Sequence, residues 1–239
     1  MIINKKNYIL IVKFRYMEKH FIFGYGSLIN KKSRQGTSPS AFSAIPVKVK
    51  NHTRGWFART GVKGLSTTFL GCLRNDSDFL NENTKSPFVN GVLYEVNKDE
   101  LPILDKREKR YIRTKIEYND IEPYQSELPK EISVWVYTNE FNDENEFLNS
   151  LPNKEFPIIQ SYVDLCISGC YEIETEFDKA KEERFSEQFI TSTTNWNKYW
   201  ANDRIYARRP HVYCPNAYEI DEQLCTLIPS TIFNAIYIE

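Results

Sequence analysis

The chain has 239 residues, of which 41% are hydrophobic and 26% are charged, and this composition excludes an intrinsically disordered protein. Lysine and arginine number 31 and aspartate and glutamate 32, so the net charge is −1 and no basic field gathers nucleic acid. No apolar run approaches the roughly 18–20 residues that span a bilayer, so we expect neither a nucleic-acid nor a membrane partner.

The N-terminal segment, residues 1–16, contains a short apolar stretch, Tyr8–Val12, followed by Lys13 and Arg15. It lacks a small-residue cleavage site, so it is not typical of a signal peptide. Met17 stands just before the first predicted strand. We therefore expect the natural start, or the start of the ordered domain, at Met17.

Four strands are predicted in the first part of the chain, which holds eight of the nine glycines. Aromatic and β-branched runs, some of them alternating with polar residues, mark them. The predicted strands are Phe21–Tyr25, Val47–Val49, Phe69–Leu73 and Val89–Val96. The glycines between them indicate tight turns.

A short helix is predicted next, with Asp99 as its N-cap and Pro102 in its first turn, where a missing N–H costs little. Further strands are predicted at Tyr111–Tyr118 and Ile132–Tyr137. The pattern from Ile158 to Cys170 is the clearest helix, because its apolar residues recur every three or four positions.

The five cysteines are an odd number and form no CxxC pair, which is not typical of a secreted disulfide protein or a zinc site. Cys166 and Cys170 lie four residues apart and are expected to be small buried side chains on one helix face. Gly169 is a candidate stop for this helix. We expect a cytoplasmic protein that needs no metal.

The last part of the chain differs in character from the rest. Residues 178–189 predict a charged amphipathic helix, and residues 191–219 are polar and rich in aromatic side chains. We expect a domain at 17–178 and a C-terminal extension at 179–239 that packs on it, since closely spaced aromatic residues usually mark ordered structure. A docking surface on this extension is an alternative, built on Arg204, Arg208 and Arg209.

The first motif is FGYGSL at residues 23–28, directly after a predicted strand. Ile29 stands where a dinucleotide-binding loop needs its third glycine, so a Rossmann site is disfavoured. Two glycines around one aromatic residue can direct backbone amides into a cavity, where they hold a carboxylate or an oxyanion. A plain tight turn is the alternative.

The second motif is LDKREKRY at residues 104–111. Alone, such a charged cluster favours a solvated helix end. The sequence offers little other acid–base machinery, because His20, His52 and His211 have no serine or cysteine partner motif. We expect His20 and His52 on the surface or in turns.

Together, these motifs resemble the γ-glutamylcyclotransferase family, which includes ChaC-like and AIG2-like proteins. Val47–Phe57, Gly91–Val96 and Pro157–Gly169 also resemble segments of that family, so the resemblance spans about residues 20–175. It implies an α+β fold with a mixed, curved or barrel-like β-sheet flanked by helices, followed by the C-terminal extension.

The resemblance also implies roles for individual residues. Glu108 corresponds to the family's catalytic carboxylate, and Lys109-Arg110 replace the glycines that relatives have between this glutamate and the next tyrosine. The residues implied in substrate binding are Tyr25, Gly26, Ser27, Leu28, Tyr111 and Tyr162.

The implied reaction is attack of a substrate's own α-amine on its γ-carbonyl, which yields 5-oxoproline and a free amine or amino acid without a metal or organic cofactor. An α-amine has an ordinary pKa of about 7.8 and a glutamate about 4.3, so a matched base requires desolvation. We therefore expect Glu108 in a recessed, partly apolar cavity, with Arg107, Lys109 and Arg110 mainly facing outward. Alternatives are related acyl chemistry on a γ-glutamylamine or protein lysine, and a non-catalytic binding or regulatory protein.

Overall fold

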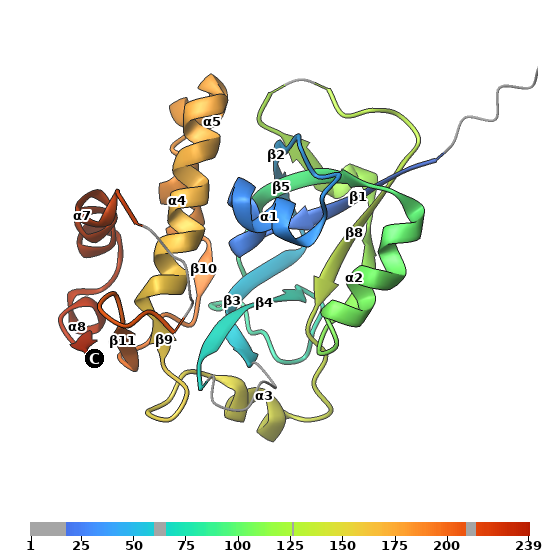
Figure 1. Ribbon diagram of the computed structural model, residues 1–239. Helices are drawn as coiled ribbons and strands as arrows, with labels where there is room; N and C mark the ends of the chain where they lie inside the picture. The colour runs from blue at the N-terminus through green and yellow to red at the C-terminus, as the bar shows by residue number, and fades with distance from the viewer. Residues whose placement is uncertain (1–17, 60–65, 126, 209–213) are drawn as a thin grey trace, which may run out of the picture.

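The computed structural model describes residues 18–59, 66–125, 127–208 and 214–239. Six strands form a mixed sheet in the order β6-β8-β1-β5-β2-β7, which curls into a half-barrel (Figure 1). Strand β1 pairs with β8 in parallel, whereas its other neighbour, β5, runs antiparallel. The strands are Lys19–Gly24 (β1), Ile45–Val49 (β2), Val89–Val96 (β5), Ile112–Ile116 (β6), Ile121–Pro123 (β7) and Ile132–Thr138 (β8).

Two three-stranded sheets complete the β structure. The first has the order β10-β3-β4 and the second the order β12-β11-β9, so each contains at least one strand from the last fifth of the chain. Their strands are His52–Arg59 (β3), Thr68–Arg74 (β4), Ile158–Ile159 (β9), Thr193–Thr194 (β10), Trp200–Asn202 (β11) and Tyr237–Ile238 (β12).

A bulge in β3 shapes the sheet that it forms with β4. The register shifts between Trp56 and Ala58, which leaves Phe57 as the extra residue. Gly55 and Gly71 face each other across the two strands, and a Cβ on either would come within 2.6 Å of the Phe57 ring. The two glycines therefore make room for the buried ring.

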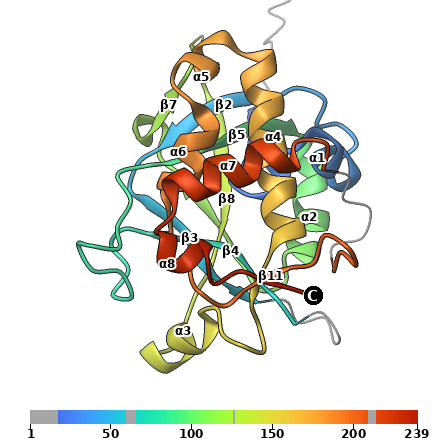
Figure 2. The same cartoon turned by 90° about the vertical axis from the view of Figure 1, so that its left-hand side faces the viewer.

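The helices gather mainly on one side of the strands. In Figure 1, α4, α5, α7 and α8 lie on one side and α2 lies on the other; in Figure 2, α7 lies in front of α6 and beside α4. The helices are Lys31–Thr37 (α1), Leu101–Arg107 (α2), Glu144–Ser150 (α3), Gln160–Glu176 (α4), Asp178–Glu182 (α5), Phe185–Thr191 (α6), Ala217–Leu227 (α7) and Ser230–Phe233 (α8). Single 3₁₀ turns occur at Ser27–Ile29 (η1), Lys98–Glu100 (η2) and Tyr118–Asp120 (η3).

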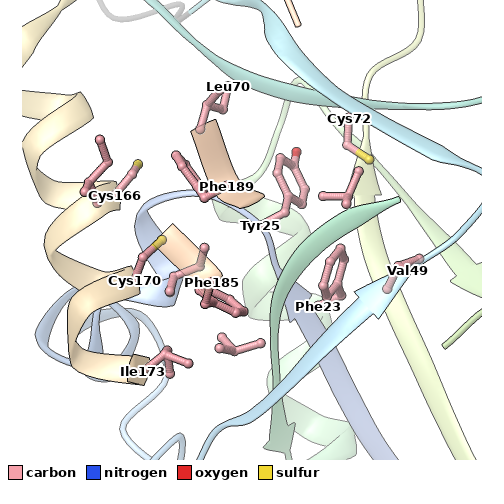
Figure 3. Close-up of a cluster of buried hydrophobic side chains, with 14 of the residues drawn as sticks. Phe23, Tyr25, Val49, Leu70, Cys72, Cys166, Cys170, Ile173, Phe185 and Phe189 are labelled. Carbon is pink, nitrogen blue, oxygen red and sulfur yellow. The ribbon is translucent and has the colours of Figure 1, made fainter. Parts of the chain in front are cut away.

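The main core joins the half-barrel to the C-terminal helices. Figure 3 shows Phe185 and Phe189 of α6 between Cys166 and Cys170 of α4 and the strand residues of the core. Both cysteines are fully buried on one helix, as predicted. Residues beyond 178 thus supply core side chains and sheet strands, while the boundary between a domain at 17–178 and an extension at 179–239 stays a prediction.

The fold class predicted from the sequence is confirmed, and each predicted strand overlaps an observed one, although the strand predicted at Tyr111–Tyr118 is only Ile112–Ile116 and Tyr118 begins η3. The strand at Val89–Val96 has the predicted bounds, and the strand at Ile132 runs one residue further, to Thr138. The segment Val47–Phe57, which resembles part of the family, belongs to two strands, β2 and β3. A turn at Asn51, whose φ is 59°, joins them. Asparagine tolerates this left-handed conformation better than most residues.

The predicted N-cap at Asp99 is wrong. The side chain of Asn97 accepts from the Glu100 amide while a Glu100 carboxylate oxygen accepts from the Asn97 amide at 2.7 Å, which forms a capping box. The helical segment therefore begins with η2, whose N-cap, Asn97, lies two residues before the predicted N-cap, Asp99. Pro102 does lie in the first turn of α2.

Two helix predictions also need correction. Helix α4 continues through Gly169 to Glu176, so this glycine is not a stop. A Cβ at Gly169 would lie 2.5 Å from the Asn30 amide nitrogen, and glycine is thus needed for close packing. The single helix predicted for 178–189 is two helices, α5 and α6, separated at Arg184, whose φ is 55°.

The expected exposure of two histidines is wrong. His20 is only 7% exposed because it lies on the central strand β1, where its ring stacks on Trp135. His52 is 5% exposed at the start of β3, and burial lowers its pKa. His211, Arg209 and Met17 lie outside the described residues.

Candidate active site

The glycine loop begins where β1 ends. A Cβ on Gly24 would lie 2.9 Å from the Leu28 Cβ, so the chain can turn back on itself only because this residue has no side chain. The Ile29 amide then donates to the Gly26 carbonyl at 2.9 Å. A 3₁₀ turn of this kind leaves its first amides without partners inside the turn.

Two buried arginines hold this loop at its ends. Arg54 donates to the Tyr25 carbonyl at 3.1 Å, and Arg34 donates to the carbonyls of Leu28 and Ile29 at 3.1 and 2.9 Å. The Tyr25 hydroxyl donates to the carbonyl of Tyr137 at 2.8 Å. The loop backbone is therefore fixed by donors from outside it.

Glu108 lies at the C-terminal end of α2. Its amide donates to the Leu104 carbonyl at 2.9 Å, and its carbonyl accepts from the Tyr111 amide at 2.8 Å, so residues 108–111 form a tight turn. The Glu108 side chain is 22% exposed, and its Oε1 lies 3.8 Å from Arg107 Nε. The carboxylate is therefore recessed and has a cationic neighbour.

The same turn brings Tyr111 to the site in spite of the shorter spacing. Its hydroxyl donates to the Leu70 carbonyl at 3.3 Å, and burial followed by the nearby Glu108 charge raises its pKa. Burial also raises the pKa of Tyr25 well above its ordinary value. Both phenols are thus protonated at neutral pH and can donate hydrogen bonds.

Tyr162 projects from the first turn of α4. Its ring makes edge contacts with Phe69 and Trp56, with centroids 4.8 and 6.0 Å apart. A Cβ on Gly26 would lie 3.1 Å from the Tyr162 hydroxyl oxygen. Glycine at this position therefore lets the loop backbone approach the tyrosine.

These elements enclose a cavity of about 720 Å³, large enough for a peptide-sized ligand. Every site residue predicted from the sequence lines it: Tyr25, Gly26, Ser27, Leu28, Glu108, Tyr111 and Tyr162. Its walls are largely aromatic and aliphatic. The lining residues include no histidine or cysteine, so Ser27 has no such base partner in the wall.

Besides Ile22 of β1, four lining residues were not singled out by the sequence, namely Arg59, Phe69, Leu70 and Tyr137. They come from β3, β4 and β8, and their place follows from strand pairing. The only local signals were that Phe69 opens a predicted strand and that Tyr137 closes one.

The expectation that Arg107, Lys109 and Arg110 mainly face outward is only partly right. All three are exposed, yet all three also line the cavity. The turn at 108–111 is so tight that residues on both sides of Glu108 stay at the cavity mouth. Arg110 Nη1 donates to the Arg59 carbonyl at 3.3 Å, which joins this turn to the end of β3.

Neither a metal-binding cluster nor a membrane-spanning helix occurs in the described ranges. No group of three or more histidine, cysteine, aspartate and glutamate side chains there has the geometry to hold a metal ion. None of the helices there has the length and apolar character needed to cross a bilayer.

The chain is similar in structure to proteins of one fold family. A γ-glutamyl cyclotransferase is 16% identical, with a TM-score of 0.46, over 70% of this chain and 87% of its own. A yeast γ-glutamyl cyclotransferase described as specific to glutathione is 13% identical, with a TM-score of 0.41, over 66% and 86%. An AIG2-like protein from Mus musculus is 17% identical, with a TM-score of 0.37, over 59% and 89%.

No protein-family model and no curated protein sequence matches the chain. These three solved structures share 13–17% identity with the chain, and their TM-scores lie between 0.37 and 0.46. At such low identities the similarity concerns the fold, and the activity has to be argued from the site itself.

Proposed function

We propose that the protein is a γ-glutamyl cyclotransferase that releases 5-oxoproline and a free amine or amino acid from a small γ-glutamyl substrate. The observation that supports this most strongly is the shared cavity. It is lined by Glu108, by the loop at residues 25–28, and by Tyr111 and Tyr162, which lie far apart in sequence. These are the residue types that the reaction needs.

Glu108 acts as the general base and then as the general acid. It removes a proton from the substrate's α-ammonium group, whose nitrogen then attacks the γ-carbonyl carbon. The proton afterwards passes to the departing nitrogen as the C–N bond breaks. Because nucleophile and electrophile belong to one molecule, the main task of the site is to hold a folded glutamyl conformer.

The glycine loop holds the glutamyl end. Gly26, Ser27 and Leu28 lie in the cavity wall, and in this proposal their backbone amides donate to the substrate carboxylate or to the oxyanion that develops on the γ-carbonyl oxygen. Arg34 and Arg54 fix this backbone in advance, so little reorganisation is needed when charge develops.

The aromatic walls limit access of water. The buried rings of Tyr25 and Tyr162 and the half-buried ring of Tyr111 frame the cavity, and their exclusion of water favours cyclisation over hydrolysis. Ser27 serves as a hydrogen-bonding wall in this scheme. We also propose that residues 179–239 brace the site, because Arg54 donates both to the Tyr25 carbonyl and to the Phe189 carbonyl of α6.

The test is release of 5-oxoproline from glutathione, γ-glutamyl-alanine and γ-glutamyl-lysine by the wild-type protein and by Glu108→Gln. Glu82→Gln is the matched control, since Glu82 is exposed and pairs with Lys85 away from the cavity. We expect release that depends on Glu108 and not on Glu82. Binding of these compounds by folded protein without any release would contradict the proposal and favour a binding protein.

A further inference from the structure

The mouth of the cavity carries an excess of positive charge. Among the residues that the structure describes, four cationic side chains line the cavity, from Arg59, Arg107, Lys109 and Arg110, against the one carboxylate of Glu108. Two of them, Lys109 and Arg110, are the residues that replace the glycines of the family pattern. The positive charge at the cavity mouth therefore comes in part from residues specific to this chain, and none of it comes from the glycine loop.

Counting carboxylates in the described part of the chain, one of the four cations has a carboxylate within salt-bridge distance. Arg107 Nε lies 3.8 Å from Glu108. Within the described ranges, no carboxylate oxygen lies within 4.0 Å of the charged nitrogens of Arg59, Lys109 or Arg110. We call these three side chains the cationic rim.

The arginines of the cationic rim are held by neutral groups. Arg59 Nη2 donates to the Leu151 carbonyl at 2.9 Å, and its guanidinium lies 4.1 Å from the centre of the Phe156 ring. Its buried Nε has no hydrogen-bond partner within the described ranges. Arg110 Nη1 donates to the Arg59 carbonyl. Within the described ranges neither guanidinium group is therefore neutralised by a salt bridge, although the charge of Glu155 acts on Arg59 from further away.

We propose that the cationic rim selects γ-glutamyl substrates whose departing half is acidic, an amino acid or peptide with a side-chain carboxylate besides its α-carboxylate. This rests on the proposed function, since the glycine loop and Glu108 take the glutamyl half and leave the other half at the cavity mouth. A departing half with a neutral side chain has only its α-carboxylate to contact the three cations of the rim. A cationic departing half is repelled by them.

The test compares three substrates of similar size that differ in one side-chain charge. They are γ-glutamyl-glutamate, γ-glutamyl-glutamine and γ-glutamyl-lysine joined through the α-amine of the lysine. We expect kcat/KM to fall in that order, with the glutamate compound preferred over the glutamine compound by roughly tenfold, as one charge-assisted contact supplies. This preference should shrink in 1 M salt, where the screening length falls to about 3 Å.

The variant Lys109→Gln/Arg110→Gln should reduce the preference for γ-glutamyl-glutamate over γ-glutamyl-glutamine to about twofold. Both residues are exposed, so the variant should fold. Arg74→Gln is the control, since Arg74 is exposed and pairs with Asp76 away from the cavity, and it should keep the wild-type preference.

Two results would overturn the inference. One is turnover of all three substrates with equal kcat/KM, or a loss in the double variant that is the same for each, which would leave the proposed function standing. The other is that 5-oxoproline is released neither from these three substrates nor from glutathione, γ-glutamyl-alanine and γ-glutamyl-lysine. This result would overturn the proposed function as well.

Discussion

Replacement of Arg54 by lysine tests whether this buried cation ties the glycine loop to the C-terminal helices. Arg54 is 0% exposed, and six hydrogen bonds at 2.7–3.1 Å connect its guanidinium to neutral oxygens. The acceptors are the carbonyls of Tyr25, Asn90 and Phe189 and the side-chain oxygens of Asn90, Ser192 and Thr193.

The cost of Arg54→Lys follows from the number of donors. A lysine ammonium has three N–H groups against the five of a guanidinium, so about three of the six acceptors lose their partner. Leaving a buried polar group unsatisfied costs about 1–3 kcal/mol, and we take the lower value because strand carbonyls keep other partners. The free energy of unfolding should therefore fall by about 3 kcal/mol, a large part of the 5–15 kcal/mol typical of a domain.

Urea unfolding followed by circular dichroism measures this loss, with Arg74→Lys as the matched control. Arg74 is exposed, and its replacement should change the free energy of unfolding by less than about 0.5 kcal/mol. Because burial lowers the pKa of Arg54 to about 10, a lysine at the same place is also pushed toward its neutral form. A loss under 1 kcal/mol for Arg54→Lys would refute the donor-counting argument.

The remaining predictions concern the site and the pH dependence. Glu108→Gln should reduce kcat by about 10²–10⁴-fold without altering the urea midpoint; an unchanged kcat would remove Glu108 from the mechanism. Gly26→Ala should reduce kcat/KM at least tenfold because its Cβ would crowd the Tyr162 hydroxyl, whereas Gly36→Ala, in open space on α1, should stabilise by about 0.4–1 kcal/mol. Burial lowers the folded-state pKa of His52, so the unfolded state binds more protons and stability should fall as pH decreases below about 6.5. In His52→Asn the slope of stability between pH 7 and 5 should be smaller than in wild type, and an equal slope would contradict this role.

Local patterns predicted the strands well because alternation and aromatic runs reflect burial on a sheet. They failed where a distant partner decides the outcome. Gly169 looked like a helix stop, yet its function is to let α4 approach Asn30. His20 looked like a surface residue, yet β1 is central in the sheet only because β5 and β8 pair on its two sides.

The candidate site shows the same division. The loop at 25–28 and Glu108 could be predicted because each belongs to a contiguous motif. Arg59 and Tyr137 could not, because they reach the cavity only through the pairing of β3 with β4 and of β8 with β1. Such pairings join residues far apart in sequence, and no local pattern records them.

The buried arginines also bear on how the glutamyl group is oriented. Arg54 has no carboxylate within 4.0 Å in the described ranges, and its neighbours are neutral oxygens and the Phe189 ring. Its uncompensated charge lies in a low-dielectric core directly behind the Tyr25 carbonyl, where a field decays less than in water. In the proposed reaction this field would favour an anion at the loop amides, which would place the substrate's α-carboxylate on the loop and direct its α-amine toward Glu108.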